Sequence, residues 1–175
     1  RMLCAINSKL PRDIRIVHVD MVPFAFNPIA DCVSKGYRYR LAHGCKDPRR
    51  QPLFDRHVVA TTAYELDLSS MQEASALLVG EHDFAAFTKL NHGRESTIRR
   101  IDACTVQELA RWRITIDVSG SGFLWNMVRI IAGTLVDVGR GKTAASSIPQ
   151  VIASRDRQET GMTMPPEGLS LEWVK

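Results

Sequence analysis

An arginine lies inside the most apolar stretch of this sequence. Arg129 is flanked by Val128 and Ile130, in a segment whose apolar residues recur every three or four positions and predict a helix with one buried stripe. Burying an unpaired charge is costly, so a buried Arg129 needs a carboxylate partner. The alternative is that Arg129 lies on the wet side of the helix and extends its charged end into solvent. Spacing alone favours this second interpretation.

Glycines mark both ends of the predicted helix, which we expect over residues 122–141. Gly120 and Gly122 interrupt the preceding strand, and Ser121 between them is a candidate N-cap. Two further glycines, at positions 139 and 141, close the helix. We expect its buried stripe to consist of Met127, Val128, Ile131, Leu135 and Val138.

A second group of residues with chemical potential lies in a predicted strand over residues 34–42. Tyr37 and Tyr39 alternate with Arg38 and Arg40, so the tyrosines share one face and the arginines the other. An aromatic face beside basic side chains can stack a nucleobase and hold phosphates. Alternating tyrosines are also common in strands that simply pack against a core. Core packing of both tyrosines is the stronger of the two interpretations.

The charge balance permits a polyanionic partner without requiring one. The net charge is +4 and the sequence pI is about 9.0. The basic residues come in local groups that suit phosphate contacts, although any one group is equally compatible with an ordinary solvated face. The groups are Lys35 with Arg38 and Arg40, then Arg49, Arg50 and Arg56, then Arg94, Arg99 and Arg100.

Several familiar catalytic and ligand-binding motifs are absent from the sequence. It contains no P-loop, no G-x-S-x-G, no H-E-x-x-H and no Rossmann glycine pattern, and its five histidines are not spaced as metal ligands. The four cysteines form no C-x-x-C pair, so we expect free thiols in a reducing cytoplasm and no zinc site. No apolar run approaches the roughly 20 residues of a membrane span, so no membrane association is expected.

The elements that must position these residues mix strands and helices without regular βαβ units. We therefore expect one α+β domain over residues 1–175, with a mostly antiparallel mixed sheet backed by helices. Residues 57–63 are an edge strand or a connection. The expected strands are 14–19, 34–42, 98–110 paired with 113–118, and 169–174, and the expected helices are 2–9, 69–79 capped by Ser69 or Ser70, 81–89, 122–141 and a short one from 146 with Pro149 in its first turn.

Segments along the whole chain resemble, in order, the motifs of tRNA pseudouridine synthases of the TruA type. Residues 123–135 read F-L-W-N-M-V-R-I-I-A-G-T-L and resemble the family's F-L-H-H-M-V-R-x-I-V-G-T-L. Residues 34–39 resemble its R-Y-R-Y motif, and residues 78–87 its L-x-G-E-H-D-F-x-x-F segment. Weaker matches are residues 10–14 with L-P-x-D-I, 96–99 with S-P-x-R, 153–157 with A-A-x-D-R and 166–171 with P-x-G-L-Y-L.

This resemblance implies a pseudouridine synthase-like catalytic domain and a function. The family isomerises uridine to pseudouridine in the anticodon stem-loop of tRNA, without cofactor or metal, and its bacterial members are homodimers. By position, Tyr37 would stack on the flipped uracil, Arg129 would pair with the catalytic aspartate, and Leu169 would pack against the base. We expect RNA contacts from the basic residues Lys35, Arg38, Arg94, Arg99 and Arg100.

Two departures from the family pattern concern the catalytic and RNA-binding residues. The family's nucleophilic aspartate lies in a G-R-T-D-A-G-V-H segment upstream of L-P-x-D-I, and no aspartate of this sequence has that context. We therefore expect the C-terminal part of a longer synthase, inactive alone. Ile29 also stands where many relatives have an arginine. The alternatives are a non-catalytic RNA-binding module of the same fold and a structural domain without RNA contacts.

Overall fold

The computed structural model describes residues 2–89 and 96–175, and the chain divides into two compact units, residues 1–31 and 32–175. The first unit contains α1 (Met2–Asn7), in agreement with the helix expected there. The strand expected over 14–19 is wrong, because no strand pairs with this segment in the described chain. Instead the Asn7 side chain accepts from Ile16 N and donates to Ile16 O, both at 2.8 Å.

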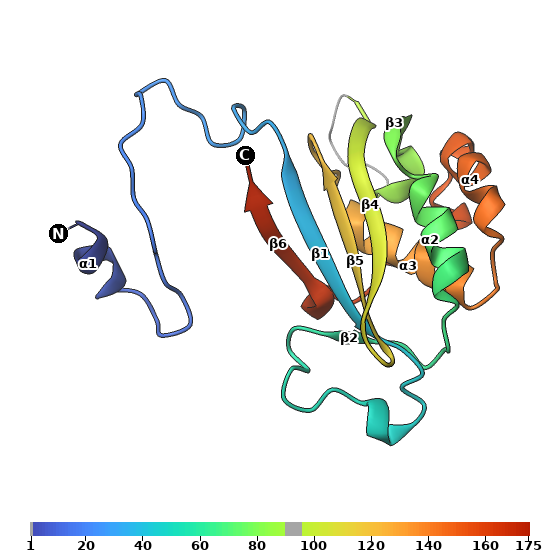
Figure 1. The fold of residues 1–175 in the computed structure, drawn as a ribbon. Coiled ribbons are helices and arrows are strands. Elements are labelled where there is room, and N and C mark those ends of the chain that lie inside the picture. The colour runs from blue at the N-terminus through green and yellow to red at the C-terminus, as the bar shows by residue number, and fades with distance from the viewer. Residues whose placement is uncertain (1, 90–95) are drawn as a thin grey trace. The chain divides into compact units, whose positions relative to one another are not determined.

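The second unit is built on a six-stranded sheet (Figure 1). The strand order is β2-β1-β5-β4-β3, and β6 pairs with β1 beside β2. Only the two-residue β1–β2 pairing is parallel, so the predicted α+β fold with a mostly antiparallel sheet is confirmed. The strands are β1 (Lys35–Ala42), β2 (Ala60–Thr61), β3 (Gly80–Asp83), β4 (Ile98–Ala110), β5 (Arg113–Gly120) and β6 (Leu169–Val174).

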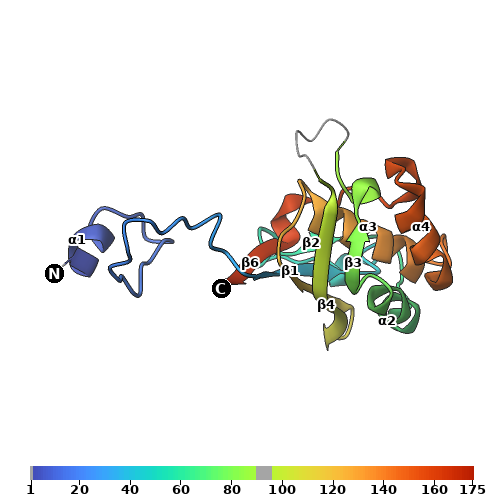
Figure 2. The ribbon, with the colours of Figure 1, turned by 90° about the horizontal axis from the view of Figure 1, so that it is seen from above.

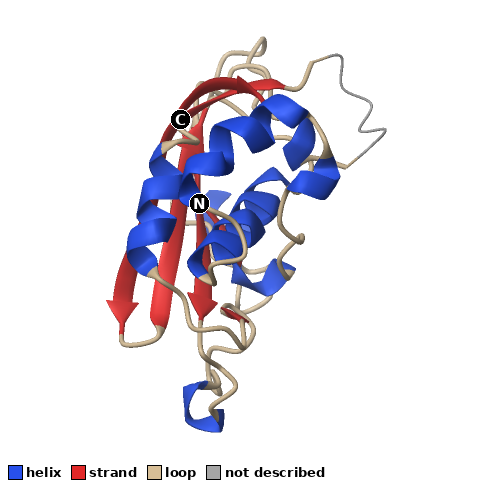
Figure 3. Cartoon of the chain, turned by 90° about the vertical axis from the view of Figure 1, so that its right-hand side faces the viewer, coloured by secondary structure: helices blue, strands red, loops and turns tan. Residues whose placement is uncertain are grey.

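Three helices, α2 (Leu68–Ala76), α3 (Met127–Gly139) and α4 (Ile148–Ser154), cover one face of the sheet (Figures 1 and 3). Seen from above, they gather on one side of the strands (Figure 2). Short 3-10 turns connect the elements, at Pro48–Arg50, Ala85–Phe87, Ala145–Ser147, Arg157–Glu159 and Pro166–Gly168. No helix among the described residues is long and apolar enough to cross a membrane.

The helix boundaries differ from the sequence expectation for identifiable reasons. The N-cap of α2 is Asp67 and not Ser69 or Ser70, because the Asp67 carboxylate accepts from Ser69 N at 3.0 Å and from the Ser70 hydroxyl at 2.7 Å. The α3 helix begins later than expected and without the Ser121 cap, since Asn126 has a left-handed φ of 61° that a helix cannot contain.

The helix expected over residues 81–89 is wrong in its first half. Residues 80–83 form β3 and pair with β4, with His82 opposite Arg99. Only Ala85–Phe87 coils, as one 3-10 turn. A four-residue strand carries too little periodicity to be distinguished from a helix by sequence.

The hydrophobic core lies between the sheet and α3. Tyr39 of β1 and Ile116 of β5 are fully buried, and the whole predicted stripe of α3 is buried as expected. Tyr39 is thus a core residue, as the core-packing interpretation predicted for it. Its hydroxyl donates to Pro165 O at 2.7 Å, and burial raises the pKa of the phenol above its usual value.

Candidate active site

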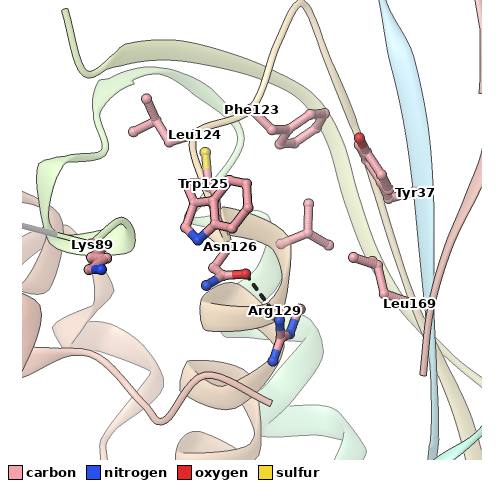
Figure 4. A pocket seen from close by; sticks show the side chains of 10 residues that line it. Tyr37, Lys89, Phe123, Leu124, Trp125, Asn126, Arg129 and Leu169 are labelled. Carbon is pink, nitrogen blue, oxygen red and sulfur yellow. Dashed lines mark hydrogen bonds between the residues drawn. The ribbon is translucent and has the colours of Figure 1, made fainter. Parts of the chain in front are cut away.

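A cavity of about 590 Å³ opens between β1, the start of β6 and the start of α3. Figure 4 shows its lining, with Tyr37 and Leu169 on the side of the sheet and Lys89 on the opposite side. Three residues that the family resemblance singled out therefore meet at one place. The lining consists of Tyr37, Lys89, Phe123, Leu124, Trp125, Asn126, Met127, Val128, Arg129 and Leu169.

Tyr37 is the aromatic wall of the cavity. It lies on the same face of β1 as buried Tyr39, but nearer the start of the strand, where it is only half-buried. The Tyr37 ring meets Phe123 edge to face, with 5.2 Å between centroids and 89° between planes. This contact fixes the tilt of the Tyr37 ring without covering it completely.

Arg129 is the cationic wall of the cavity. Its Nε donates to Met164 O at 2.6 Å, and one terminal nitrogen donates to Asn126 Oδ1 at 3.0 Å. Both acceptors are neutral, and Arg129 forms no ion pair with a carboxylate among residues 2–89 and 96–175. Arg129 is half-buried, so neither of the two sequence interpretations describes it fully. Its positive charge faces the cavity without a described counter-charge.

The loop before β6 is packed tightly against α3. A Cβ on Gly133 would overlap the carbonyl oxygen of Met162, and a Cβ on Gly161 would overlap the backbone at Gly133. The Thr134 hydroxyl accepts from Gly161 N at 3.0 Å, and Met164 N donates to Arg129 O at 3.3 Å. Because these contacts join the loop to the turn that carries Arg129, the positions of Arg129 and Leu169 are coupled.

Arg157 is hydrogen-bonded to several residues of the same loop. Its guanidinium donates to the Thr160 hydroxyl at 2.7 Å, Gly161 O at 2.9 Å and the Thr163 hydroxyl at 3.0 Å. Burial lowers the pKa of Arg157 below its usual value. Arg157 falls in a family segment that this sequence matches. It therefore stabilises the loop and does not line the cavity.

Leu169 begins β6 and pairs with Tyr39 of β1. The turn before it allows this close approach because Gly168 has no side chain: a Cβ there would lie 2.7 Å from Arg40 O and 2.7 Å from the Tyr39 ring. The half-buried Leu169 side chain then completes the apolar wall beside Tyr37 (Figure 4).

None of the described basic residues that were expected to contact RNA lines this cavity. Arg38 lies on the opposite face of β1, where its guanidinium donates to Asp117 at 2.7 and 3.3 Å, and this hydrogen bond raises its pKa. Arg100 forms an ion pair with Asp102 at 3.0 Å, and Arg99 donates to Ser96 O at 3.1 Å. Lys35 lies at the start of β1, and Arg94 lies outside the described residues.

Sequence reasoning gave no site role to seven of the ten lining residues. Phe123, Trp125 and Asn126 stood inside the matched 123–135 segment, so their place before the helix was a usable signal. Lys89 carried no signal, since a single lysine has no distinguishing spacing.

Residues 74–175 match the family model described as tRNA pseudouridine synthase. The chain belongs to this family. Among curated relatives, the tRNA pseudouridine synthase A of Geotalea uraniireducens is 43% identical over 166 residues, which is 95% of this chain and 66% of the relative. The synthase A of Geotalea daltonii is 45% identical with the same coverages. The tRNA pseudouridine synthase A 2 of Protochlamydia amoebophila is 37% identical over 99% of this chain and 66% of its own length.

These relatives confirm the TruA-type resemblance seen in the sequence motifs. The chain spans about two thirds of the length of each relative it matches.

Proposed function

We propose that this chain supplies the uracil-binding, arginine-bearing part of an enzyme that converts uridine to pseudouridine in the anticodon stem-loop of tRNA. The observation that carries this proposal is the cavity itself. In a member of the synthase family, one cavity is lined by a tyrosine, a leucine and an arginine without a described carboxylate partner. The proposal includes tRNA as the partner and a homodimeric, cytoplasmic enzyme.

Isomerisation of uridine needs no net gain or loss of atoms. The bond between C1′ and N1 breaks, the uracil turns, and a bond from C1′ to C5 replaces it, while C5 loses a proton and N1 gains one. The base must leave its stack to react, and an aromatic ring compensates for the lost stacking. Tyr37, held by Phe123, would stack on the uracil, and Leu169 would pack against the base.

Arg129 would pair with the nucleophilic aspartate. The described lining of the cavity contains no aspartate or glutamate, which supports a nucleophile supplied from outside residues 1–175. A guanidinium beside a carboxylate lowers its pKa and keeps it ionised at neutral pH. Met164 O and Asn126 Oδ1 already hold the guanidinium in place, so little reorganisation is needed to receive that carboxylate.

RNA contacts through Lys35, Arg38, Arg94, Arg99 and Arg100 stay part of the proposal. Binding through phosphate contacts weakens steeply as the salt concentration rises. The slope of log affinity against log salt therefore measures the number of such contacts. Arg38 and Arg100 are less suited to a phosphate, because their charges are already paired with Asp117 and Asp102.

The same lack of a described acidic residue in the cavity favours one alternative, a non-catalytic RNA-binding module. A tritium-release assay with [5-³H]uridine-labelled tRNA separates the two, because only isomerisation frees the hydrogen at C5. The assay compares the 175-residue chain with the longer product of its gene. Release by the longer form alone supports the proposal. Release by neither form, with tRNA still bound, favours the binding module, and release by the 175-residue chain contradicts an external nucleophile.

A further inference from the structure

The indole of Trp125 is exposed at the cavity although it belongs to the segment that starts α3. Trp125 is 70% exposed. The two other tryptophans each have a cation over the ring, Arg113 over Trp112 and Lys175 over Trp173. Trp125 has no ring or cation partner among the described residues. An aromatic ring that lines a cavity without a packing partner is available to stack on a ligand.

An exposed lysine lies across from this ring. Lys89 lines the same cavity and forms no ion pair among the described residues (Figure 4). The neighbouring Thr88 is buried, and its hydroxyl donates to Trp125 O at 3.2 Å. This hydrogen bond joins the backbone that carries Lys89 to the backbone that carries Trp125. The backbone segments that carry the ring and the cation are therefore joined where both side chains line the cavity.

The charges of the cavity indicate what this pair binds. Lys89 and Arg129 are both cationic, and the described lining contains no acidic residue, so an anionic ligand is favoured. A nucleotide combines a stacking surface with a phosphate, which matches an aromatic ring beside a lysine. When a uridine is flipped out, the nucleotide next to it loses a stacking neighbour, and an exposed indole can replace that neighbour.

We propose that Trp125 and Lys89 form a second nucleotide subsite, distinct from the Tyr37 wall, for the nucleotide adjacent to the flipped uridine. Trp125 stacks on the base of that nucleotide, and Lys89 binds its phosphate. The subsite rests on the proposed function, since it requires an RNA strand with one base already in the cavity.

Tryptophan emission and RNA anisotropy test the subsite together. The 175-residue chain and its Trp125→Phe variant are titrated with an in vitro transcribed, fluorescently labelled tRNA. Anisotropy measures binding, and the difference in emission quenching between the two proteins isolates Trp125. We expect a saturable quenching difference that follows the binding curve. Trp125→Leu should weaken the affinity about 10-fold, since base stacking on an aromatic ring is removed.

The charge of Lys89 is tested by the salt dependence of binding. Lys89→Met should reduce the slope of log affinity against log salt by about 1, the loss of one phosphate contact. Matched controls are Lys46→Met and Phe54→Leu, an exposed lysine and an exposed phenylalanine that do not line the cavity. Neither control should change affinity or slope.

Two outcomes overturn the subsite, and they are distinguishable. If tRNA binds with equal affinity to the wild-type chain and to Trp125→Leu, without a quenching difference, the subsite is wrong and the proposed function stands. If the wild-type chain does not bind tRNA at all, the subsite fails, and the tritium-release assay on the longer form decides the proposed function separately.

Discussion

Arg38 and Arg129 are both half-buried arginines of the same unit, but only Arg38 is paired with a described carboxylate. Arg38, on the face of β1 away from the helices, is neutralised by two hydrogen bonds to Asp117. Arg129, on the helix-covered side, is held by a carbonyl and an amide oxygen that leave its charge intact. The counter-charge of a basic residue, more than its sequence neighbours, therefore indicates whether it can serve an anionic ligand.

The largest expected effect separates these two arginines directly. In the proposed longer enzyme, Arg129→Gln should reduce tritium release at least about 100-fold, because the charge beside the proposed nucleophile is lost. Arg38→Gln should reduce it no more than about 3-fold and cost about 1 kcal/mol or less of stability, since the pair with Asp117 is partly exposed. Equal losses of activity in two well-folded variants would contradict the distinction.

The second prediction tests how the helix-covered side holds its arginine. Gly133→Ala places a methyl group against Met162 O, so we expect a loss of about 2 kcal/mol in the free energy of unfolding, measured by urea denaturation. Gly122→Ala is the matched control, because its Cβ would meet only the Arg99 side chain at 3.9 Å. If both variants unfold at the wild-type urea concentration, the contact between α3 and the loop does not hold Arg129 as described.

A smaller effect is expected from the residue that orients Arg129. Asn126→Gly keeps the left-handed backbone, which glycine adopts readily, but removes the bond from Arg129 to Asn126 Oδ1. We expect about a 10-fold loss of kcat in the longer form with stability nearly unchanged. Unaltered kcat would show that Met164 O alone positions the guanidinium.

The smallest expected effect concerns pH and the core on the helix-covered side. Burial, with a smaller contribution from Asp117, raises the pKa of the Cys104 thiol to about 12. Above pH 9 the unfolded chain loses this proton while the folded chain keeps it, so stability falls as pH rises from 9 towards 12. Between pH 8 and 10 the loss is about 1 kcal/mol. Arg38 stays charged in this window because Asp117 raises its pKa.

Urea denaturation at pH 8 and pH 10 checks this expectation. Cys104→Ala should flatten the change between the two pH values, although its own cavity lowers stability at both. A pH response as steep as that of the wild type would assign the alkaline loss to other groups, of which buried Tyr39 is the first candidate.

The regular elements of the fold were predictable where the pattern was long. The alternation in 34–42 and 113–118 and the stripe from Met127 to Val138 gave strands and a helix that the structure confirms. The prediction failed for short or unpaired segments. Residues 14–19 alternate like a strand but have no partner strand in the described chain. Residues 80–83 are too few for a periodicity to be recognised.

The site was predictable only in part, and for a physical reason. Family motifs singled out Tyr37, Arg129 and Leu169, and the structure brings all three to one cavity. The hydrogen-bond partners of Arg129 could not be foreseen. Met164 lies 35 positions away, and the left-handed turn at Asn126 that offers its amide to Arg129 falls inside the segment that the sequence predicted as helix.

The pairing of β1 with strands from distant parts of the chain affects how the sheet forms during synthesis. One edge of β1 pairs with β5, and the other is shared by β2 and β6. During synthesis, β1 and its Tyr37 therefore leave the ribosome more than 120 residues before the strand that closes this edge. Until residues 169–174 arrive, the nascent sheet carries an open edge, and such long-range closure is slow. Chaperone capture of ribosome-bound chains should accordingly persist until β6 emerges.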